Sequence, residues 1–187
     1  RRAGVHTAAH AHTEESISAA LRAGVNTIEH GTYLTDPVID LLLETGGAVI
    51  PTVAVYQDIA NNTSLDPGFR AVGQRVSDVR PAYFQEALRR GVCFGVGTDA
   101  SVLFPAAKIV TEMEAMAQLG MSNAQVIHAA TAVNARLLGL EREVGSIEPG
   151  KIADLAVVDG DPIEDLDHLR SIHCGIKAGQ MYGRKEI

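Results

Sequence analysis

Residues 5–31 read VHTAAHAHTEESISAALRAGVNTIEHG, and this stretch decides the fold class. A short apolar run, Val5 to Ala11, precedes Thr13, whose hydroxyl is typical of a helix N-cap. Apolar residues then recur at the three- and four-residue spacing of one helical face, until Gly24 ends the helix. A second apolar run, Val25 to Glu29, begins directly afterwards. The stretch therefore predicts a strand, a helix and a second strand, which is the βαβ unit of a parallel sheet.

The same alternation continues to residue 138. Further strands are expected at 48–55 and 92–96. Further helices are expected at 38–45, 81–90, 105–119 and 123–138. Residues 57–80 are punctuated by Asn, Pro and Gly, and they predict a surface excursion with some helix. The strand spacing indicates an α/β fold, either a TIM-type barrel or a doubly wound sheet.

The character of the sequence changes after Gly139. Glycine-marked turns there precede two apolar runs, at 153–158 and at 172–177. These runs predict strands of a small annex that does not continue the βα rhythm. We therefore expect two parts, residues 1–141 and residues 142–187.

The composition fits a globular chain and argues against two classes of partner. Apolar residues make up 46% of the 187 residues, which is enough to bury a core. The net charge is -7, so nucleic acid is a poor partner, and no apolar run reaches the roughly 18 residues that a membrane span needs. Cys93 and Cys174 lack a metal-binding or disulfide spacing, which favours the reducing cytoplasm. Residue 1 is not Met, so we expect that the beginning is missing and leave open a targeting signal upstream.

Three strand ends carry side chains that could bind a metal. His10 and His12 close the first strand, His30 closes the second, and Asp99 closes the fourth. Ligand sites of parallel α/β folds lie at these carboxyl ends, so we expect the side chains to converge. Imidazole and carboxylate are ligands of zinc and related divalent ions, and three protein ligands with one open position are typical of a catalytic site.

The alternative is that each histidine only forms hydrogen bonds with neighbouring backbone. That explanation is favoured for any single histidine, but three candidates on three strand ends favour a metal. His10 and His12 point to the same side of their strand. We expect His10 to bind the metal, and His12 to lie near the substrate or behind the ligands. Tyr56, beyond the third strand, is a second candidate for substrate contact, although such a tyrosine often only packs its ring.

Longer motifs resemble the amidohydrolase superfamily, and they cover nearly the whole chain. They are AHAH at 9–12, IEHG at 28–31, GTDA at 97–100, AATAVNA at 129–135 and GSIEPGKIADLAVVD at 145–159. Within the superfamily, the chain is most similar to imidazolonepropionase-like and Xaa-Pro dipeptidase (prolidase)-like hydrolases, which share the IPT segment, here residues 50–52. The resemblance implies strands 5 to 8 of a (β/α)8 barrel over residues 1–141 and strands of a small β-sandwich over 142–187.

The resemblance also implies a reaction. His10 and His30 match two histidine ligands, and Asp99 matches a carboxylate that binds metal and shuttles a proton. The expected activity is hydrolysis of amide or other carbon–nitrogen bonds, in which a metal-activated hydroxide attacks a carbonyl, with a dipeptide or other small molecule as substrate. Zinc or another divalent ion is the expected cofactor, and two ions are expected in the full-length enzyme.

Two features of the family pattern are absent from the sequence. These barrels carry a His-x-His pair on the first strand and a carboxylated lysine on the fourth, and none of the four lysines, Lys108, Lys151, Lys177 and Lys185, is suitably placed. A complete barrel needs about 250 residues. We therefore expect the missing N-terminal half of the same protein, or self-association, to complete the fold. The alternatives are a truncated, non-catalytic half-barrel that self-associates or needs a complementary chain, and a single zinc held by His10, His30 and Asp99.

Overall fold

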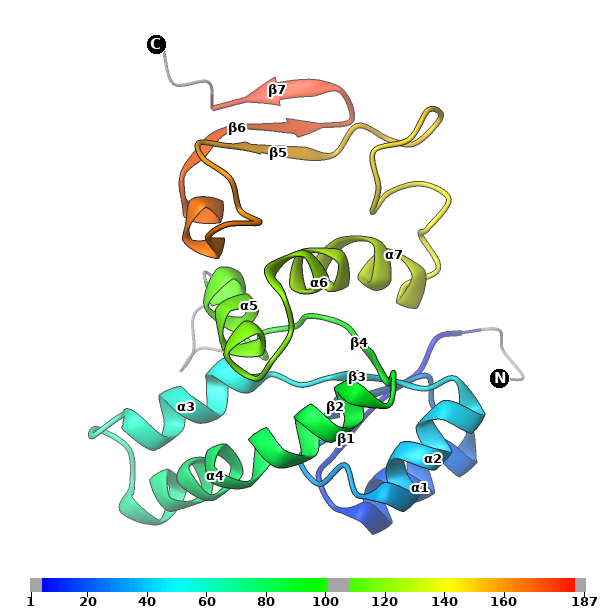
Figure 1. Cartoon of the computed structure of the whole chain (residues 1–187), viewed down its shortest axis with the longest axis vertical. Helices are drawn as coiled ribbons and strands as arrows, with labels where there is room; N and C mark the ends of the chain where they lie inside the picture. Colours follow the sequence, from blue (N-terminus) through cyan, green and yellow to red (C-terminus); the bar gives the residue numbers. More distant parts are fainter. Residues whose placement is uncertain (1–4, 101–107, 184–187) are drawn as a thin grey trace.

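The computed structural model describes residues 5–100 and 108–183. Its first half is a parallel sheet in the order β1-β2-β3-β4 (Figure 1). The strands are β1 (Ala8–Ala11), β2 (Thr27–His30), β3 (Ala48–Ile50) and β4 (Cys93–Phe94). The chain thus has an α/β fold with a parallel sheet, as predicted.

Helices connect and follow these strands. They are α1 (Glu14–Ala23), α2 (Asp36–Thr45), α3 (Val53–Asn61), α4 (Pro67–Arg89), α5 (Ile109–Gln118), α6 (Asn123–His128) and α7 (Asn134–Leu137). A π-helical turn, Ala129–Val133, joins α6 to α7. None of the described helices is both long enough and apolar enough to cross a membrane.

The sheet has two different faces because strand side chains alternate. Ile28 and Val49 are fully buried, and they belong to a core to which α1, α2 and α4 also contribute. Glu29 and Ile50, the next residues along β2 and β3, are only half-buried and line a cavity on the opposite face. One face of the sheet therefore carries the core, and the other carries the candidate site.

Residues 57–80 contain more helix than the predicted surface excursion with some helix. These residues belong largely to α3 and to the 23-residue α4, which runs on through Pro81 to Arg89. Asp66 accepts hydrogen bonds from the backbone N–H groups of the first turn, so Asp66 and Pro67 mark a helix start and not a turn. Gly73 has no side chain to separate the two helices, and a Cβ there would lie 2.7 Å from the backbone nitrogen of Ala60.

The third strand is shorter than the predicted range 48–55. β3 ends at Ile50, and residues 53–55 open α3, although Val53 and Val55 have strand propensity. The backbone N–H groups at the start of α3 bond to Glu112, a partner that local sequence does not reveal. The helix predicted at 105–119 corresponds to α5, and its first three residues lie outside the described range.

The C-terminal part forms a second, antiparallel sheet in the order β5-β6-β7. Its strands are β5 (Leu155–Val158), β6 (Ile172–Lys177) and β7 (Gln180–Tyr182), and the third was not predicted. In Figure 1 this sheet lies at one end of the molecule, with α5, α6 and α7 between it and the parallel sheet. Arg170, in the 3-10 helix Leu166–Arg170, bonds to Glu114 of α5 and ties the two parts together.

Candidate metal centre

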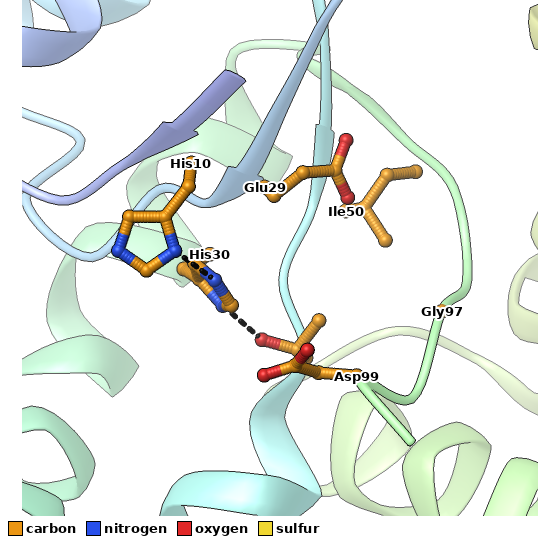
Figure 2. Close-up of a pocket in the computed structure, with 7 residues that line it drawn as sticks. His10, Glu29, His30, Ile50, Gly97 and Asp99 are labelled. Carbon is orange, nitrogen blue, oxygen red and sulfur yellow. Dashed lines mark hydrogen bonds between the residues drawn. The ribbon is translucent and has the colours of Figure 1, made fainter. Parts of the chain in front are cut away.

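The predicted site residues gather at one edge of the parallel sheet. His10 lies in β1, His30 ends β2 and Asp99 follows β4, so the parallel strands bring all three to the same end. A cavity of about 230 Å³ opens there (Figure 2). Its lining consists of His10, Glu29, His30, Ile50, Thr52, Gly97 and Asp99. The structure thus places the three predicted ligands around one cavity, while their roles as ligands stay predictions.

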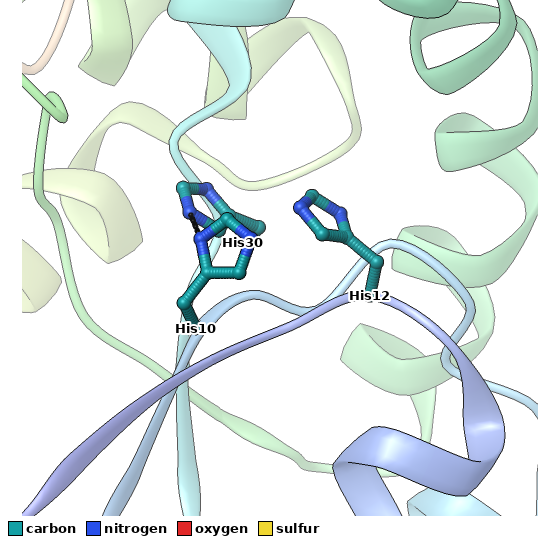
Figure 3. Close-up of side chains that lie close together, drawn as sticks. All are labelled: His10, His12 and His30. Atoms are coloured by element: carbon teal, nitrogen blue, oxygen red, sulfur yellow. Dashed lines mark hydrogen bonds between the residues drawn. The ribbon is translucent and has the colours of Figure 1, made fainter.

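Three imidazoles form the centre of this arrangement. Nε2 of His30 lies 2.8 Å from Nδ1 of His10, and a hydrogen bond joins them. One ring nitrogen from each of His10, His12 and His30 lies within 4.8 Å of the others, a spacing that could hold a metal ion (Figure 3). Neutral imidazole nitrogens and a carboxylate on the same cavity are a donor set that suits zinc and similar divalent ions.

Burial keeps two of the imidazoles neutral. Desolvation, followed by the repulsion of His12, His10 and Arg80, lowers the pKa of His30 to about 3. Desolvation, followed by the repulsion of His10 and Arg80, lowers the pKa of His12 to about 4. Both rings therefore carry an unprotonated nitrogen at neutral pH, which is the form that a metal requires.

Thr52 fixes the orientation of His30. Its Oγ1 lies 2.7 Å from Nδ1 of His30, which leaves Nε2 of that ring facing His10. A hydrogen bond to one ring nitrogen is how proteins set the tautomer and the angle of a metal-binding histidine. Thr52 was missed in the sequence, because a threonine after a strand is too common to single out.

The backbone is strained at the cavity. His30, Thr52 and Asp99 have φ values of 75°, 47° and 51°, in the left-handed region that residues with a Cβ rarely adopt. Such a conformation costs about 1–2 kcal/mol per residue. It persists only where the surroundings hold it, and it tends to cluster at functional sites. All three residues line the same cavity, so the strain is concentrated at the candidate centre.

His12 and Tyr56 lie beside the centre. Nδ1 of His12 bonds to Oγ1 of Thr32 at 2.7 Å, and its Nε2 bonds to the Tyr56 hydroxyl at 3.1 Å. Both partners of His12 lie outside the pair formed by His10 and His30, whereas Nε2 of His30 faces His10. His12 therefore fits a position behind or beside the ligands better than ligation. Tyr56 lies in the first turn of α3, and desolvation raises the pKa of its phenol, so the hydroxyl keeps its proton.

A second feature that the sequence did not reveal holds the segment leading to Asp99. The side-chain amide of Asn134 accepts a bond from the N–H of Val96 and donates one to its carbonyl, at 3.0 and 2.8 Å. Asn134 directly follows the π-helical turn, and such turns often occur at functional sites. Asn134 therefore anchors the chain just before Gly97 and Asp99.

The model of the amidohydrolase family matches residues 1–182. The chain belongs to the amidohydrolase family. Its parallel sheet is consistent with part of an amidohydrolase barrel.

Solved structures of this amidohydrolase fold agree with the assignment. A Xaa-Pro dipeptidase with bound methionine is 36% identical with a TM-score of 0.89, and the match covers 97% of this chain and 45% of that one. A prolidase complexed with N-methylphosphonate-L-proline is 29% identical with a TM-score of 0.89, covering 98% of this chain and 46% of that one. Among curated relatives, ochratoxinase from Aspergillus niger is 29% identical over 162 residues, which is 84% of this chain and 33% of that protein. The chain spans half or less of the length of these relatives.

Proposed function

We propose that the chain is the second half of a metal-dependent hydrolase that cleaves amide or other carbon–nitrogen bonds. The observation that carries the proposal is the convergence of His10, His30 and Asp99 on one cavity at the carboxyl ends of the strands. Membership of the amidohydrolase family supports the same reaction class. In this proposal the parallel strands are strands 5 to 8 of the barrel, and the C-terminal strands belong to a β-sandwich.

The metal-binding residues follow from the donor atoms. His10 and His30 would hold a divalent ion through the ring nitrogens that face each other, and Asp99 would hold the same ion or a second one. When bound, such an ion polarises a carbonyl and lowers the pKa of water to near 7. Zinc fits the imidazoles, and two ions are proposed for the complete enzyme.

The remaining steps belong to residues of this chain. Asp99 would accept a proton from the attacking water and later deliver it to the leaving nitrogen, as a general base and then a general acid. The Tyr56 hydroxyl, which keeps its proton, would donate a hydrogen bond to the substrate, and His12 would hold that hydroxyl in place.

A dipeptide with a C-terminal proline is the narrower substrate proposal. The Xaa-Pro dipeptidase and the prolidase support it, whereas ochratoxinase shows that the family resemblance extends to a protein with a different name and substrate. In this proposal, the missing N-terminal half would complete the part of the cavity that selects the substrate.

The missing half of the barrel is the proposed partner. β1 and β4 are the edge strands of the described sheet, so their outer backbone groups have no strand beside them. Unpaired edges favour pairing with a further strand. We propose that an N-terminal half of the same protein pairs with them and contributes the remaining ligands.

The test uses the complete encoded protein, loaded with zinc or stripped with a chelator. Each form is assayed for amine release from Xaa-Pro dipeptides and from N-acyl amino acids. Zinc-dependent cleavage of at least one class is expected, with Xaa-Pro dipeptides preferred. Absence of bound metal together with absence of cleavage would reject the proposed function, and cleavage of N-acyl amino acids alone would reject only the dipeptidase proposal.

A further inference from the structure

Two buried charged residues hold the turn between β3 and α3. Arg80, on α4, is only 3% exposed, and its Nη1 donates to the carbonyl of Pro51. Glu112, on α5, is fully buried, and its two carboxylate oxygens accept from the N–H groups of Val53 and Ala54, each at 2.7 Å. The four-residue turn 51–54 is therefore held at its first residue by one side chain and at its last two by the other.

Glu112 replaces the ordinary cap of α3. The first N–H groups of a helix have no partner within the helix, and the N-cap side chain usually supplies one. Thr52 occupies the N-cap position, but it has a left-handed backbone and makes no capping bond. Its hydroxyl instead bonds to His30. Because Glu112 satisfies the free N–H groups from a distant helix, Thr52 is available to His30.

Arg80 also contacts Tyr56, whose hydroxyl bonds to the other histidine, His12. Its guanidinium carbon lies 5.1 Å from the centre of the Tyr56 ring, a cation–π contact, and the Tyr56 hydroxyl lies 3.1 Å from Nε2 of His12. Arg80 Nε and Nη2 have no hydrogen-bond partner among the described residues. Burying a guanidinium with unpartnered N–H groups costs free energy. A contribution of Arg80 to folding stability is therefore not a sufficient reason for an arginine at this buried position.

We propose that Arg80 and Glu112 are positioning residues for the metal centre. By holding residue 51 and residues 53–54 of this turn, they set Thr52 against His30 and Tyr56 against His12. The roles of the two histidines in binding metal and substrate rest on the proposed function, whereas the geometric coupling does not. A purely structural role would instead contribute to folding without affecting the histidine rings.

The main experiment compares four variants of the complete encoded protein. E112Q and R80K change Glu112 and Arg80, which together form the clamp on the 51–54 turn. E114Q on α5 and R89K on α4 are matched controls, since Glu114 and Arg89 lie on the same helices and take part in solvent-accessible ion pairs. The chemical shifts of the histidine ring nitrogens are measured in metal-free protein, and zinc affinity is measured by competition with a chelator.

The two clamp variants are expected to shift the ring-nitrogen signals of His30 or His12, and the controls are not. Zinc affinity should fall about 10-fold in E112Q, the range in which partners behind metal ligands act. If the complete protein is active, kcat should fall in E112Q by a larger factor than KM rises. The reason is that Glu112 positions Thr52, which orients the proposed ligand His30. Wild-type ring signals in both clamp variants would overturn the proposal.

A double-mutant cycle covers the case in which E112Q does not fold. R80K and T52V are then combined with each other, and each is also measured alone. If Arg80 acts through the turn, R80K should lower zinc affinity far less in the T52V background than in the wild type. Full additivity would overturn the proposal. If no variant, nor the wild type, binds zinc, the proposed function fails, and the ring-nitrogen shifts still decide whether the clamp exists.

Discussion

Residues other than glycine adopt a positive φ in two regions, at the cavity beside the parallel sheet and in the C-terminal sheet, but for different reasons. Four described residues other than glycine have positive φ, and three of them, His30, Thr52 and Asp99, line the cavity. The fourth, Ala178, lies in the tight connection between β6 and β7, followed by Gly179 with φ 81°. Hairpins with two-residue connections favour positive φ at both residues. Ala178 is thus explained by turn geometry, whereas the strain at the cavity is not.

The two regions also differ in how they treat polar side chains. At the cavity, His30 is 5% exposed and both its ring nitrogens have protein partners. In the C-terminal sheet, Asp154 bonds to an exposed Lys177, and His173 pairs with Asp159 at 3.3 Å near solvent. Surface pairs of this kind contribute little free energy, while buried polar groups need specific partners. This contrast supports placing the proposed hydrolysis at the cavity, although the C-terminal segment carries one of the family motifs.

The largest expected effect compares one carboxylate from each region. D99A should lower kcat/KM by at least about 10³-fold, because it removes both a general base and a proposed metal ligand. D154A should leave turnover close to that of the wild type, since among the described residues Asp154 bonds to Lys177 and to the backbone N–H of Ala178. The measurement is steady-state hydrolysis by the complete protein. Turnover retained within a few-fold in D99A would remove Asp99 as the proton carrier.

The next effect compares two histidines. H30A should weaken zinc binding by more than about 100-fold, because even partners behind metal ligands contribute 10- to 100-fold. H173A, in the C-terminal sheet, should bind zinc as the wild type does. Chelator competition and metal analysis of the purified proteins check both. Equal zinc affinity in H30A and H173A would contradict the placement of the metal at the cavity.

A third comparison separates strain that serves the site from strain that serves a turn. A178G should raise the free energy of unfolding by about 0.5–1 kcal/mol, because glycine adopts positive φ without a Cβ penalty. T52G relieves the same strain but loses the hydrogen bond to His30, so its stability should change little while zinc affinity falls about 10-fold. Urea unfolding and zinc titration of both variants test the pair. Unchanged zinc affinity in T52G would mean that the strained threonine has no role in the centre.

The sequence predicted the parallel sheet and the convergence of the ligand candidates because both depend on local patterns. Strand length, helix spacing and Gly24 define β1, α1 and β2 directly, and the carboxyl ends of parallel strands must share one edge. The prediction of a surface excursion with some helix at 57–80 underestimated the helical content, because Asp66-Pro67-Gly68 has the composition of a turn but starts α4. Local composition does not distinguish these two uses.

The side chains that organise the centre could not be predicted in this way. Thr52 can bond to His30 because Glu112 caps α3 in its place. Glu112 lies 59 residues beyond Val53 and 58 beyond Ala54, the residues from whose N–H groups it accepts hydrogen bonds. Asn134 contributes because its side chain bonds to Val96, which lies 38 residues earlier in the chain and just beyond β4. Both contacts depend on tertiary packing, which overrides the propensities that a single sequence expresses. A buried charge within an apolar helix, such as Glu112 in α5, is the one signal that could have indicated such a partner.

The smallest predicted effect concerns pH and the buried carboxyl that holds the turn. Burial raises the pKa of Glu112, although bonds from Ala54 and Val53 and the charge of Arg80 oppose the shift. Above pH 4.5, the ordinary pKa of a glutamate side chain, the folded state therefore binds more protons at this site than the unfolded state. The contribution of Glu112 to the free energy of unfolding should fall as the pH rises from 4.5 through the raised pKa.

The difference between wild type and E112Q isolates this contribution, because other titrating groups are common to both proteins. Urea unfolding of the complete protein between pH 4.5 and 7.5 should show the free-energy difference, wild type minus E112Q, decreasing with pH. No comparable buried carboxylate at a helix start serves the C-terminal sheet in the described residues, so the effect should be specific to the turn beside the cavity. A difference that stays constant over this range would mean that the carboxylate of Glu112 is ionised as readily in the folded protein as in the unfolded chain. The clamp would then hold the turn with an already charged side chain, stabilised by Arg80 and the helix N-terminus.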